Sequence, residues 1–528
     1  MAAVVVIALV IRLLGLGWGL PGERQFVSLH PDEFRFVDPV ARSLASGEVS
    51  PEKYAYGSLP FDLLYGSARV LGAAGMELDS SDLLLIARIW SALFGAATVL
   101  VVGRLGARLG GPAVGLVAAG LLALAPGHLQ HSHFATVDVP ATFFVALALL
   151  FACRARDESR GAPSTRDLWI GGVAAGLAAA CKYPAGLVLV AVVAALLQLR
   201  IPLGKRLRAS FVAAAASGVA FVVVMPWALL DWTEFWSAVR FELFEHQAAG
   251  HGEEFTGTGP GLWFLLRINL AWALGWPAAL AGLAGLLLRL PRDPRGRALL
   301  AFALPVLVAL SLSQVRFMRY TLVLQPVLCV SAALLVEGLR LGNGARWALR
   351  SLMLAPAATA GLLVLATLLR PDPRWQAEDW MRAQVPEGAT IGLPRLPSFE
   401  SPALVPPPAG PPIDLNTSPP AARRWFERQN RHGKGKWKGV LIERWDAELL
   451  AREAPEWFVI SEMRFGTALR REGSKARSFF EELEAGWERA ATFDTFPPSW
   501  RRWFGVPFAP HDALYTFPQV RVYRRRGS

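Results

Sequence analysis

Cysteine is scarce in this sequence and charge is sparse, and both shortages narrow the classes of protein to which it can belong. Only 3 cysteines occur among 528 residues, and charged residues make up 18% of the chain. Cys153, Cys181 and Cys329 lie in or beside apolar runs, without the spacing of a metal site or of a disulfide framework. We therefore expect them to be buried packing residues. A soluble chain of this length normally has more charge and fewer hydrophobic residues than the 53% found here.

The sequence also lacks several patterns that would point to other functions. It shows no repeat at a fixed period and no matched broken helices of the kind found in inverted-repeat transporters. Its net charge is +12, but the arginines recur in short loops rather than in one basic arm, which argues against nucleic-acid binding. Residues 2–20 have no basic start and no A-x-A cleavage site, and Arg12 interrupts them, so we expect an uncleaved first helix.

Long apolar runs are what the sequence has instead. Many reach roughly the 17–25 residues that a helix needs to cross the hydrocarbon core of a membrane. We expect about eleven spans, near residues 2–20, 83–103, 111–129, 134–153, 168–182, 184–199, 209–230, 261–288, 298–314, 320–339 and 351–370. The loops on one side of this arrangement are rich in arginine, as the cytoplasmic side usually is. The carboxyl terminus is then expected outside.

Two domains follow from this reading. Residues 1–370 are expected to form the transmembrane domain, and residues 371–528 a small extracytoplasmic α/β domain. The second part opens with the helix-like DPRWQAEDWMRAQVPEG, continues through a proline-rich stretch at 394–420, and contains the strand-like runs GATIGL, EWFVISE and VRVYRR. None of these segments matches a catalytic motif. The predicted fold class is therefore a mainly α polytopic membrane protein with a small outer α/β domain.

Charged and aromatic residues gather in the first large outer loop, residues 21–82, where HPDEFRFVDP follows the first span. Charge at that depth is costly without a task or a partner. A hydroxyl group that attacks the anomeric carbon of a sugar must lose a proton, which Asp32 or Glu33 could accept. The other carboxylate could bind a metal or orient the acceptor. Alternatively, His30, Pro31 and Asp32 simply cap a helix beside the membrane.

A histidine-rich segment, HLQHSHFATVDVP, joins the third and fourth expected spans on the same face. His128, His131, His133 and Asp138 could bind a metal or a phosphate, or could be interfacial histidines followed by a helix-capping aspartate. A divalent metal is a possible cofactor that the sequence does not identify. Its oxygen and nitrogen ligands could come from Asp32, Glu33, His133 and Asp138.

Four cations are also expected at the outer face, where the positive-inside rule disfavours them: Arg88, Lys182, Arg316 and Arg319. A lipid-phosphate leaving group needs such charge as its bond breaks. Each could instead anchor a span at the headgroups. A second outer loop, 231–260, is expected to hold an amphipathic helix on the membrane, followed by a glycine-rich segment that could gate a substrate.

The amino-terminal two-thirds of the sequence resembles glycosyltransferase family 39 and its bacterial relatives, which include protein O-mannosyltransferases and lipid A aminoarabinose transferases. The resemblance rests on the Asp32-Glu33 pair, ARIWSALFG with Arg88, HFATVDVPATFF with Asp138, and ACKYPAG with Lys182. MPWALLD and the RYTLVLQPVL run that begins at Arg319 add to it.

The resemblance implies a C-type glycosyltransferase fold and transfer of a sugar, with inversion, from a polyprenyl-phosphate donor to a hydroxyl group of a lipid, glycan or protein. Asp32 would be the catalytic base, with Glu33 beside it. The residues expected to contact donor or acceptor are His30, Lys53, Tyr56, Arg88, His133, Asp138, Lys182, Arg316 and Arg319. The segment EKYAYGSLP lacks the proline pair that aminoarabinose transferases share after this lysine, so lipid A is not indicated as the acceptor. A bacterial inner membrane or a plasma membrane is the expected location.

Two other functions remain open. A polytopic transporter or lipid-carrier flippase would place ionisable residues near the middle of spans and on both faces. Arg12 is the clear mid-span charge in this sequence. A non-catalytic anchor for the outer domain would need few spans and no pair of carboxylates.

Overall fold

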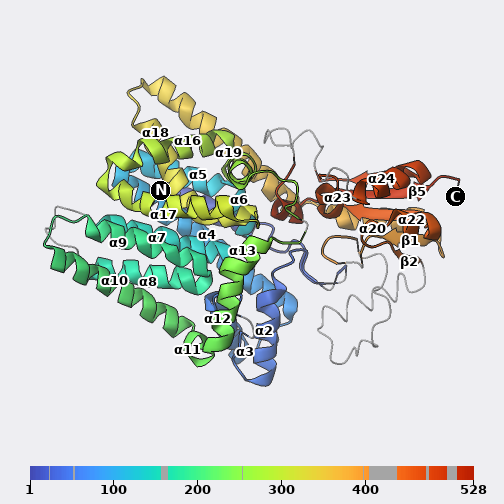
Figure 1. Cartoon of the computed structure of the whole chain (residues 1–528), viewed down its shortest axis with the longest axis horizontal. Coiled ribbons are helices and arrows are strands. Elements are labelled where there is room, and N and C mark those ends of the chain that lie inside the picture. Colours follow the sequence, from blue (N-terminus) through green and yellow to red (C-terminus); the bar gives the residue numbers. More distant parts are fainter. Residues whose placement is uncertain are drawn as a thin grey trace.

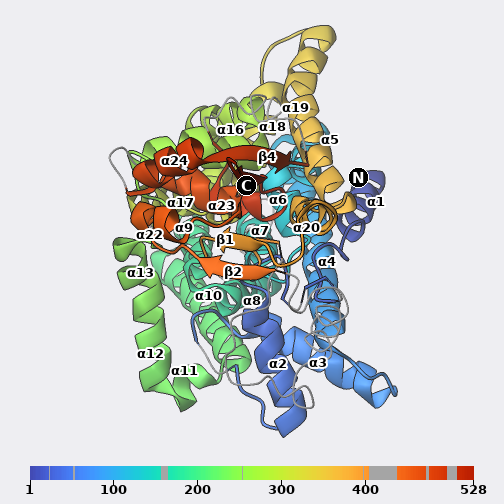
Figure 2. The ribbon, with the colours of Figure 1, turned by 90° about the vertical axis from the view of Figure 1, so that its right-hand side faces the viewer.

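The computed structural model describes residues 1–22, 24–25, 27–51, 54–155, 164–252, 254–395, 398–402, 437–470, 475–495 and 508–527. Helices form a bundle, and a smaller part that contains a sheet lies beside one end of this bundle (Figure 1). Seen from that end, the smaller part lies in front of the helices (Figure 2). The chain is therefore mainly α with a small carboxyl-terminal sheet, as the sequence predicts.

The bundle is built from the apolar runs. Its main helices are α1 (Ala2–Leu13), α4 (Ser80–Gly110), α5 (Pro112–Leu124), α6 (Pro126–His131), α7 (Asp138–Ala155), α8 (Thr165–Cys181), α9 (Leu189–Leu197), α10 (Leu203–Val224), α16 (Trp276–Leu288), α17 (Pro294–Leu312), α18 (Gln325–Glu337) and α19 (Asn343–Leu369). Helix α7 lies mostly buried in the bundle, whereas α10 presents large apolar side chains such as Phe211 and Val223 on the outside. Exposed apolar surface of this extent fits a lipid environment better than water.

Six helical segments of the described residues are long and apolar enough to cross a membrane: Ser80–Gly110, Asp138–Ala155, Leu203–Val224, Pro294–Leu312, Met318–Glu337 and Asn343–Leu369. A bent pair, Gly261–Leu274 with Trp276–Arg292, makes up to seven. The other expected spans fall on α8 and on three shorter apolar helices, Ala2–Leu13, Pro112–Leu124 and Tyr183–Leu197. The number eleven and the topology that follows from it stay predictions.

The expected span 261–288 is broken rather than straight. It begins with α14 (Gly261–Phe264), a π-helical turn at Leu265–Asn269 and α15 (Leu270–Leu274). Gly275 then has a φ of 81°, in the left-handed region that favours glycine, and Pro277 lies in the first turn of α16. The two parts of the pair meet at 116°.

Both of the large loops that are expected outside contain helices. The first holds α2 (Phe34–Ser46) and α3 (Leu59–Ala73). The second follows α11 (Trp227–Leu230) and holds α12 (Trp232–Arg240), a π-helical turn at Phe241–Glu245 and α13 (His246–Ala249). The exposed Trp232 and Trp236 fit the expected amphipathic helix. The glycines that follow, at positions 250, 252, 257 and 259, all have positive φ, so this segment needs glycine to follow its path.

The carboxyl-terminal sheet has the strand order β2-β1-β3-β5-β4. Its strands are β1 (Thr390–Leu393), β2 (Lys438–Leu441), β3 (Trp457–Ser461), β4 (Trp487–Phe493) and β5 (Val520–Arg525). Strand β1 runs parallel to β2 and β3, while β5 runs antiparallel to β3 and β4. Its helices are α20 (Pro373–Gln384), α22 (Ala447–Glu453), α23 (Glu462–Ala468) and α24 (Lys475–Gly486).

The central strand β3 is buried on both faces because its side chains alternate between two cores. Trp457 and Val459 pack with Met381 of α20, whereas Phe458 and Ile460 pack in the other core, with α24. The helix-like and strand-like runs named from the sequence correspond to α20, β1, β3 and β5. Most of the proline-rich stretch 394–420 lies outside the described residues.

Candidate functional site

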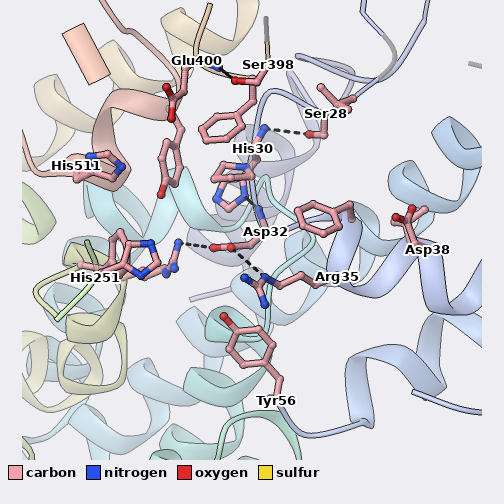
Figure 3. A pocket seen from close by; sticks show the side chains of 18 of the residues that line it. Ser28, His30, Asp32, Arg35, Asp38, Tyr56, His251, Ser398, Glu400 and His511 are labelled. Atoms are coloured by element: carbon pink, nitrogen blue, oxygen red, sulfur yellow. Dashed lines mark hydrogen bonds and ion pairs between the residues drawn. The ribbon is translucent and has the colours of Figure 1, made fainter. Parts of the chain in front are cut away.

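A cavity of about 900 Å³ lies where the two large loops of the bundle, 21–82 and 231–260, meet the carboxyl-terminal part. Its polar lining comes from the first loop, from the α13 region, from the 3₁₀ helix η6 (Met318–Leu324) and from the carboxyl-terminal part. These residues include His30, Asp32, Arg35, Tyr56, Glu242, His246, His251, Glu254, Arg319, Tyr320, Arg395, Glu400, His511 and Tyr515. Figure 3 shows Asp32 on the cavity wall between His30 and Tyr56, with Arg35 beside it.

Asp32 and Arg319 form an ion pair on this wall. Asp32 precedes α2 in the first loop, and its Oδ2 lies 2.8 Å from Nη1 of Arg319, while Nε of Arg35 lies 3.5 Å from Oδ1. Burial would raise the pKa of Asp32, but the charges on Arg319 and Arg35 hold it below its usual range. The cavity therefore presents an ionised carboxylate directly beside a cation.

Glu33, the other expected catalytic carboxylate, points into the protein rather than into the cavity. Its oxygens accept hydrogen bonds from Nε and Nη2 of Arg88 at 2.9 and 2.8 Å, from Ala135 N at 2.8 Å and from the Ser28 hydroxyl. Nη1 of Arg88 donates to the carbonyl oxygens of Leu16 and Trp18. This buried network joins α4 to the segments that follow α1 and that precede α2 and α7. We therefore propose a structural rather than a catalytic task for Glu33 and Arg88.

A stability measurement separates these two roles. We expect Glu33→Gln to leave the Arg88 guanidinium buried without its full charge partner and to lower the free energy of unfolding by about 3–5 kcal/mol. The unfolding temperature of the purified protein in detergent should fall, and its abundance in membranes should drop. Replacing the partner as well, in Glu33→Gln with Arg88→Met, should restore part of the loss. A normally stable but inactive Glu33→Gln protein would instead indicate a catalytic task.

The expected residues of the histidine-rich segment do not line the cavity. Oδ1 of Asp138 lies 2.6 Å from Nζ of Lys182, which itself lies 4.0 Å from the centre of the Tyr320 ring. Because Tyr320 lines the cavity, this pair supports the wall from behind. Both ring nitrogens of His133 contact backbone oxygens, at 2.8 Å (Leu129) and 2.9 Å (Leu14).

The suggested metal ligands are dispersed over these separate contacts. Asp32 faces the cavity, Glu33 is bonded to Arg88, Asp138 to Lys182, and His133 to the backbone. Within the ranges described above, no group of three or more histidine, cysteine, aspartate or glutamate side chains could hold a metal ion. Those four residues therefore do not fit a shared metal site in this arrangement.

The remaining expected contacts divide between the cavity and other places. Nη1 of Arg316 donates to the Thr258 hydroxyl at 2.7 Å and to Gly259 O at 2.6 Å, away from the main cavity. His30 lines the cavity, with ring centres 4.4 Å from Phe134 and 4.9 Å from Tyr515. Lys53 lies outside the described residues.

The largest omission of the sequence reading is the carboxyl-terminal contribution to the cavity. Phe399, Glu400, His511 and Tyr515 line it, although their segments match no catalytic motif. One signal was present: a histidine, an aspartate and a tyrosine stand in the otherwise apolar run FAPHDALYTF. Polar residues inside an apolar run need partners when they are buried.

A second omission is the chain of polar contacts along the loop 231–260. Nδ1 of His246 lies 3.3 Å from Oε2 of Glu242, and its Nε2 lies 3.1 Å from Nδ1 of His251.

Burial lowers the pKa of His30 to about 4 and that of His511 to about 3. These two histidines are therefore uncharged at neutral pH, and the arginines supply the positive charge of the cavity.

Comparison with solved structures places this arrangement in a known fold. The chain is similar to ArnT from Cupriavidus metallidurans bound to undecaprenyl phosphate, with a TM-score of 0.50, 16% identity, and coverage of 99% of this chain and 97% of that one. The apo form of ArnT gives a TM-score of 0.51 and 18% identity over 70% of each chain.

The archaeal oligosaccharyltransferase AglB from Archaeoglobus fulgidus, solved with an inhibitory peptide and a dolichol-phosphate, shares the fold as well. It gives a TM-score of 0.50 and 13% identity, over 99% of this chain and 88% of that one. No curated protein sequence matches the chain. Residues 2–243 match the sequence profile of the family described as dolichyl-phosphate-mannose-protein mannosyltransferase. The matched part of the chain, which contains Asp32, Glu33, Arg88, Asp138 and Lys182, is therefore similar to that mannosyltransferase family.

Proposed function

We propose that the chain transfers a sugar from a polyprenyl-phosphate carrier to a hydroxyl acceptor on the extracytoplasmic side of a membrane. The observation that carries this proposal is the Asp32–Arg319 pair, 2.8 Å apart, on the wall of a cavity at one end of an apolar bundle. A group that can accept a proton and a group that can hold a phosphate stand side by side there. The family match and the fold shared with ArnT and AglB support it.

The reaction assigns one task to each member of the pair. The acceptor oxygen attacks the anomeric carbon from the face opposite the phosphate, and its proton passes to Asp32. The bond between the anomeric carbon and the phosphate oxygen breaks, and its electrons leave with the polyprenyl phosphate. Arg319 stabilises the charge that develops on that leaving group. Attack from the opposite face inverts the configuration at the anomeric carbon.

Donor binding prepares the base in this mechanism. Before the donor arrives, the Arg319 guanidinium is engaged by the Asp32 carboxylate. The incoming phosphate competes for the same guanidinium, which weakens its hold on Asp32 and raises the pKa of that carboxylate towards a range better suited to accept a proton. The base is thereby activated only when the leaving group is in place.

The cavity is large enough for the sugar donor and the acceptor to bind side by side. A volume of about 900 Å³ lies at the upper end of the roughly 300–1,000 Å³ usual for small-molecule sites. We propose that Tyr320, with the Lys182–Asp138 pair behind it, borders the donor side, since Nζ of Lys182 lies 4.0 Å from that ring. His30 and Tyr56 would contact the sugar or the acceptor hydroxyl.

The charge of the loops supports the proposed sidedness. The connection from α9 to α10 lies at the end of the bundle away from the sheet (Figure 1). It and the first turns of α10 carry Arg200, Lys205, Arg206 and Arg208. By the positive-inside rule, this charge supports a cytoplasmic position for that end and an extracytoplasmic position for the cavity.

The test is transfer by the purified protein in liposomes. We expect labelled sugar to leave a polyprenyl-phosphate donor and free polyprenyl phosphate to accumulate when acceptors from cell-envelope extracts are supplied. A panel of donor sugars, together with a search for the glycan that disappears when the protein is removed from cells, would identify both substrates. Movement of intact donor across the bilayer without release of sugar would contradict the proposal and favour the flippase alternative.

A further inference from the structure

The carboxyl-terminal part reaches the reacting pair through one buried carboxylate. Asp512 lies in the 3₁₀ helix η8 (His511–Tyr515) and is fully buried. Its Oδ1 accepts a hydrogen bond from Met318 N at 2.9 Å, and its Oδ2 accepts one from Arg319 N at 2.8 Å. These are the first two residues of η6, whose N–H groups have no partner inside that helix.

Contacts from the bundle and from α20 hold Asp512 and its helix in place. Nε2 of His131 lies 3.5 Å from Oδ2 of Asp512, and Nε2 of Gln130 donates to Asp512 O at 3.0 Å. Burial would raise the pKa of Asp512, but His131 and Arg319 lower it to about 2. Further along η8, Tyr515 O accepts a hydrogen bond from Nη2 of Arg374 at 2.8 Å. The Asp512 carboxylate is therefore ionised, and its helix η8 is held both by the bundle and by α20.

We infer that Asp512 is a positioning residue that sets where Arg319 stands against Asp32. The backbone of Arg319 is fixed by the Asp512 carboxylate, and its guanidinium lies 2.8 Å from Asp32. A displacement of η8 is thus transmitted to the ion pair. The carboxyl-terminal part is then a component of the transfer machinery rather than an accessory domain. This inference rests on the proposed sugar transfer.

The substitution Asp512→Asn tests the two hydrogen bonds from the backbone of η6 to Asp512 with little change in side-chain shape. The amide can accept from one of the two N–H groups, but its NH₂ faces the other, so one buried donor loses its partner. We expect kcat/KM for transfer to fall by about 10-fold or more, through kcat rather than KM for the acceptor. Glu378→Gln is the matched control, because Glu378 is a buried carboxylate of α20 that pairs with Arg382 at 2.9 Å and does not line the cavity.

The pH profile reports on Asp32 separately from general damage. The groups that act on Asp32 are Arg319, His30, Arg35 and His251. A displaced Arg319 lowers the pKa of Asp32 less, so the acid limb of kcat/KM should move to higher pH in Asp512→Asn and stay in place in Glu378→Gln. In an Arg319→Gln background, Asp512→Asn should add almost nothing, because both substitutions act through the same guanidinium.

Asp512→Glu keeps the charge and both acceptor oxygens but moves the carboxylate by one methylene group. We expect an intermediate loss of kcat/KM in this variant. If Asp512→Asn does not accumulate in the membrane, Asp512→Glu alone tests the positioning role. If the variants that fold keep the wild-type kcat/KM and the wild-type pH profile, Asp512 has no positioning role. The proposed transferase function would not be affected by that result. Absence of transfer by the wild-type protein would remove the proposed function and this inference together.

Discussion

Asp32→Asn should abolish most sugar transfer while leaving the protein in the membrane at normal abundance. Asparagine keeps the shape of the side chain but cannot accept the proton of the attacking hydroxyl at neutral pH. Loss of a general base typically costs about 10²- to 10⁴-fold, and we expect kcat for transfer from a polyprenyl-phosphate donor to fall within that range. The measurement is release of labelled sugar at saturating donor, with abundance followed by immunoblotting.

A control in the same loop makes this experiment specific. Glu48 is exposed and lies outside the cavity, so Glu48→Gln removes one negative charge from the first loop without touching the site. We expect its transfer rate to stay within about 2-fold of the wild-type rate, since surface substitutions usually have small effects. Unchanged transfer in Asp32→Asn would remove Asp32 from the mechanism. Equal losses in both variants would point to a general electrostatic effect of the loop.

Arg319→Gln should also lower transfer strongly, by about 10²- to 10³-fold, because the departing phosphate loses its charge partner. Affinity for polyprenyl phosphate should fall as well, and Arg319→Lys should recover part of it, since a lysine keeps the charge but not the planar guanidinium. Thermal stabilisation by added polyprenyl phosphate measures that affinity without any acceptor. Wild-type affinity and wild-type transfer in Arg319→Gln would place the donor phosphate elsewhere.

The same variant has a pH signature of known sign. Arg319 helps to hold the pKa of Asp32 below its usual range, while burial acts in the opposite direction. Without the arginine, burial prevails and the pKa of Asp32 rises. The carboxylate is then protonated at a higher pH, so the acid limb of kcat/KM should move upwards. An unmoved acid limb would mean that the titrating group of the reaction is not Asp32.

The helices of the bundle were largely readable from the sequence because a membrane span is a local property of composition and length. The places where the prediction deviates are those where the backbone leaves the regular helix. Gly275 and Pro277 end one helix and start another in the predicted span 261–288. Residues 318–324, which overlap the start of the predicted span 320–339, form a 3₁₀ helix. That departure places Arg319 on the cavity wall.

The candidate site was predictable only in part, because a local sequence pattern does not indicate which distant residues form ion pairs. Asp32 and Arg319 could each be named from charge in an apolar context, but their pairing joins segments that are far apart in the chain. Asp32 and Glu33 are neighbours in sequence and looked equivalent. Their partners separate them: Arg319 at the cavity for one, buried Arg88 for the other.

The contribution of the tail to the cavity was missed for a related reason. A search for catalytic motifs overlooks residues that act by lining a cavity or by holding a backbone in place. His511 and Tyr515 line the cavity, and Asp512 bonds to the backbone of η6. Their short helix η8 contributes to the cavity only because the carboxyl-terminal part packs against the bundle.

The most direct test of the central claim is an experimental structure of the protein with polyprenyl phosphate bound. We expect the phosphate in the cavity between the bundle and the carboxyl-terminal part, bonded to the Arg319 guanidinium, with the Asp32 carboxylate released towards the space that a sugar would occupy. A phosphate bound at the arginine-rich end of the bundle, or outside this cavity with the Asp32–Arg319 pair intact, would contradict it.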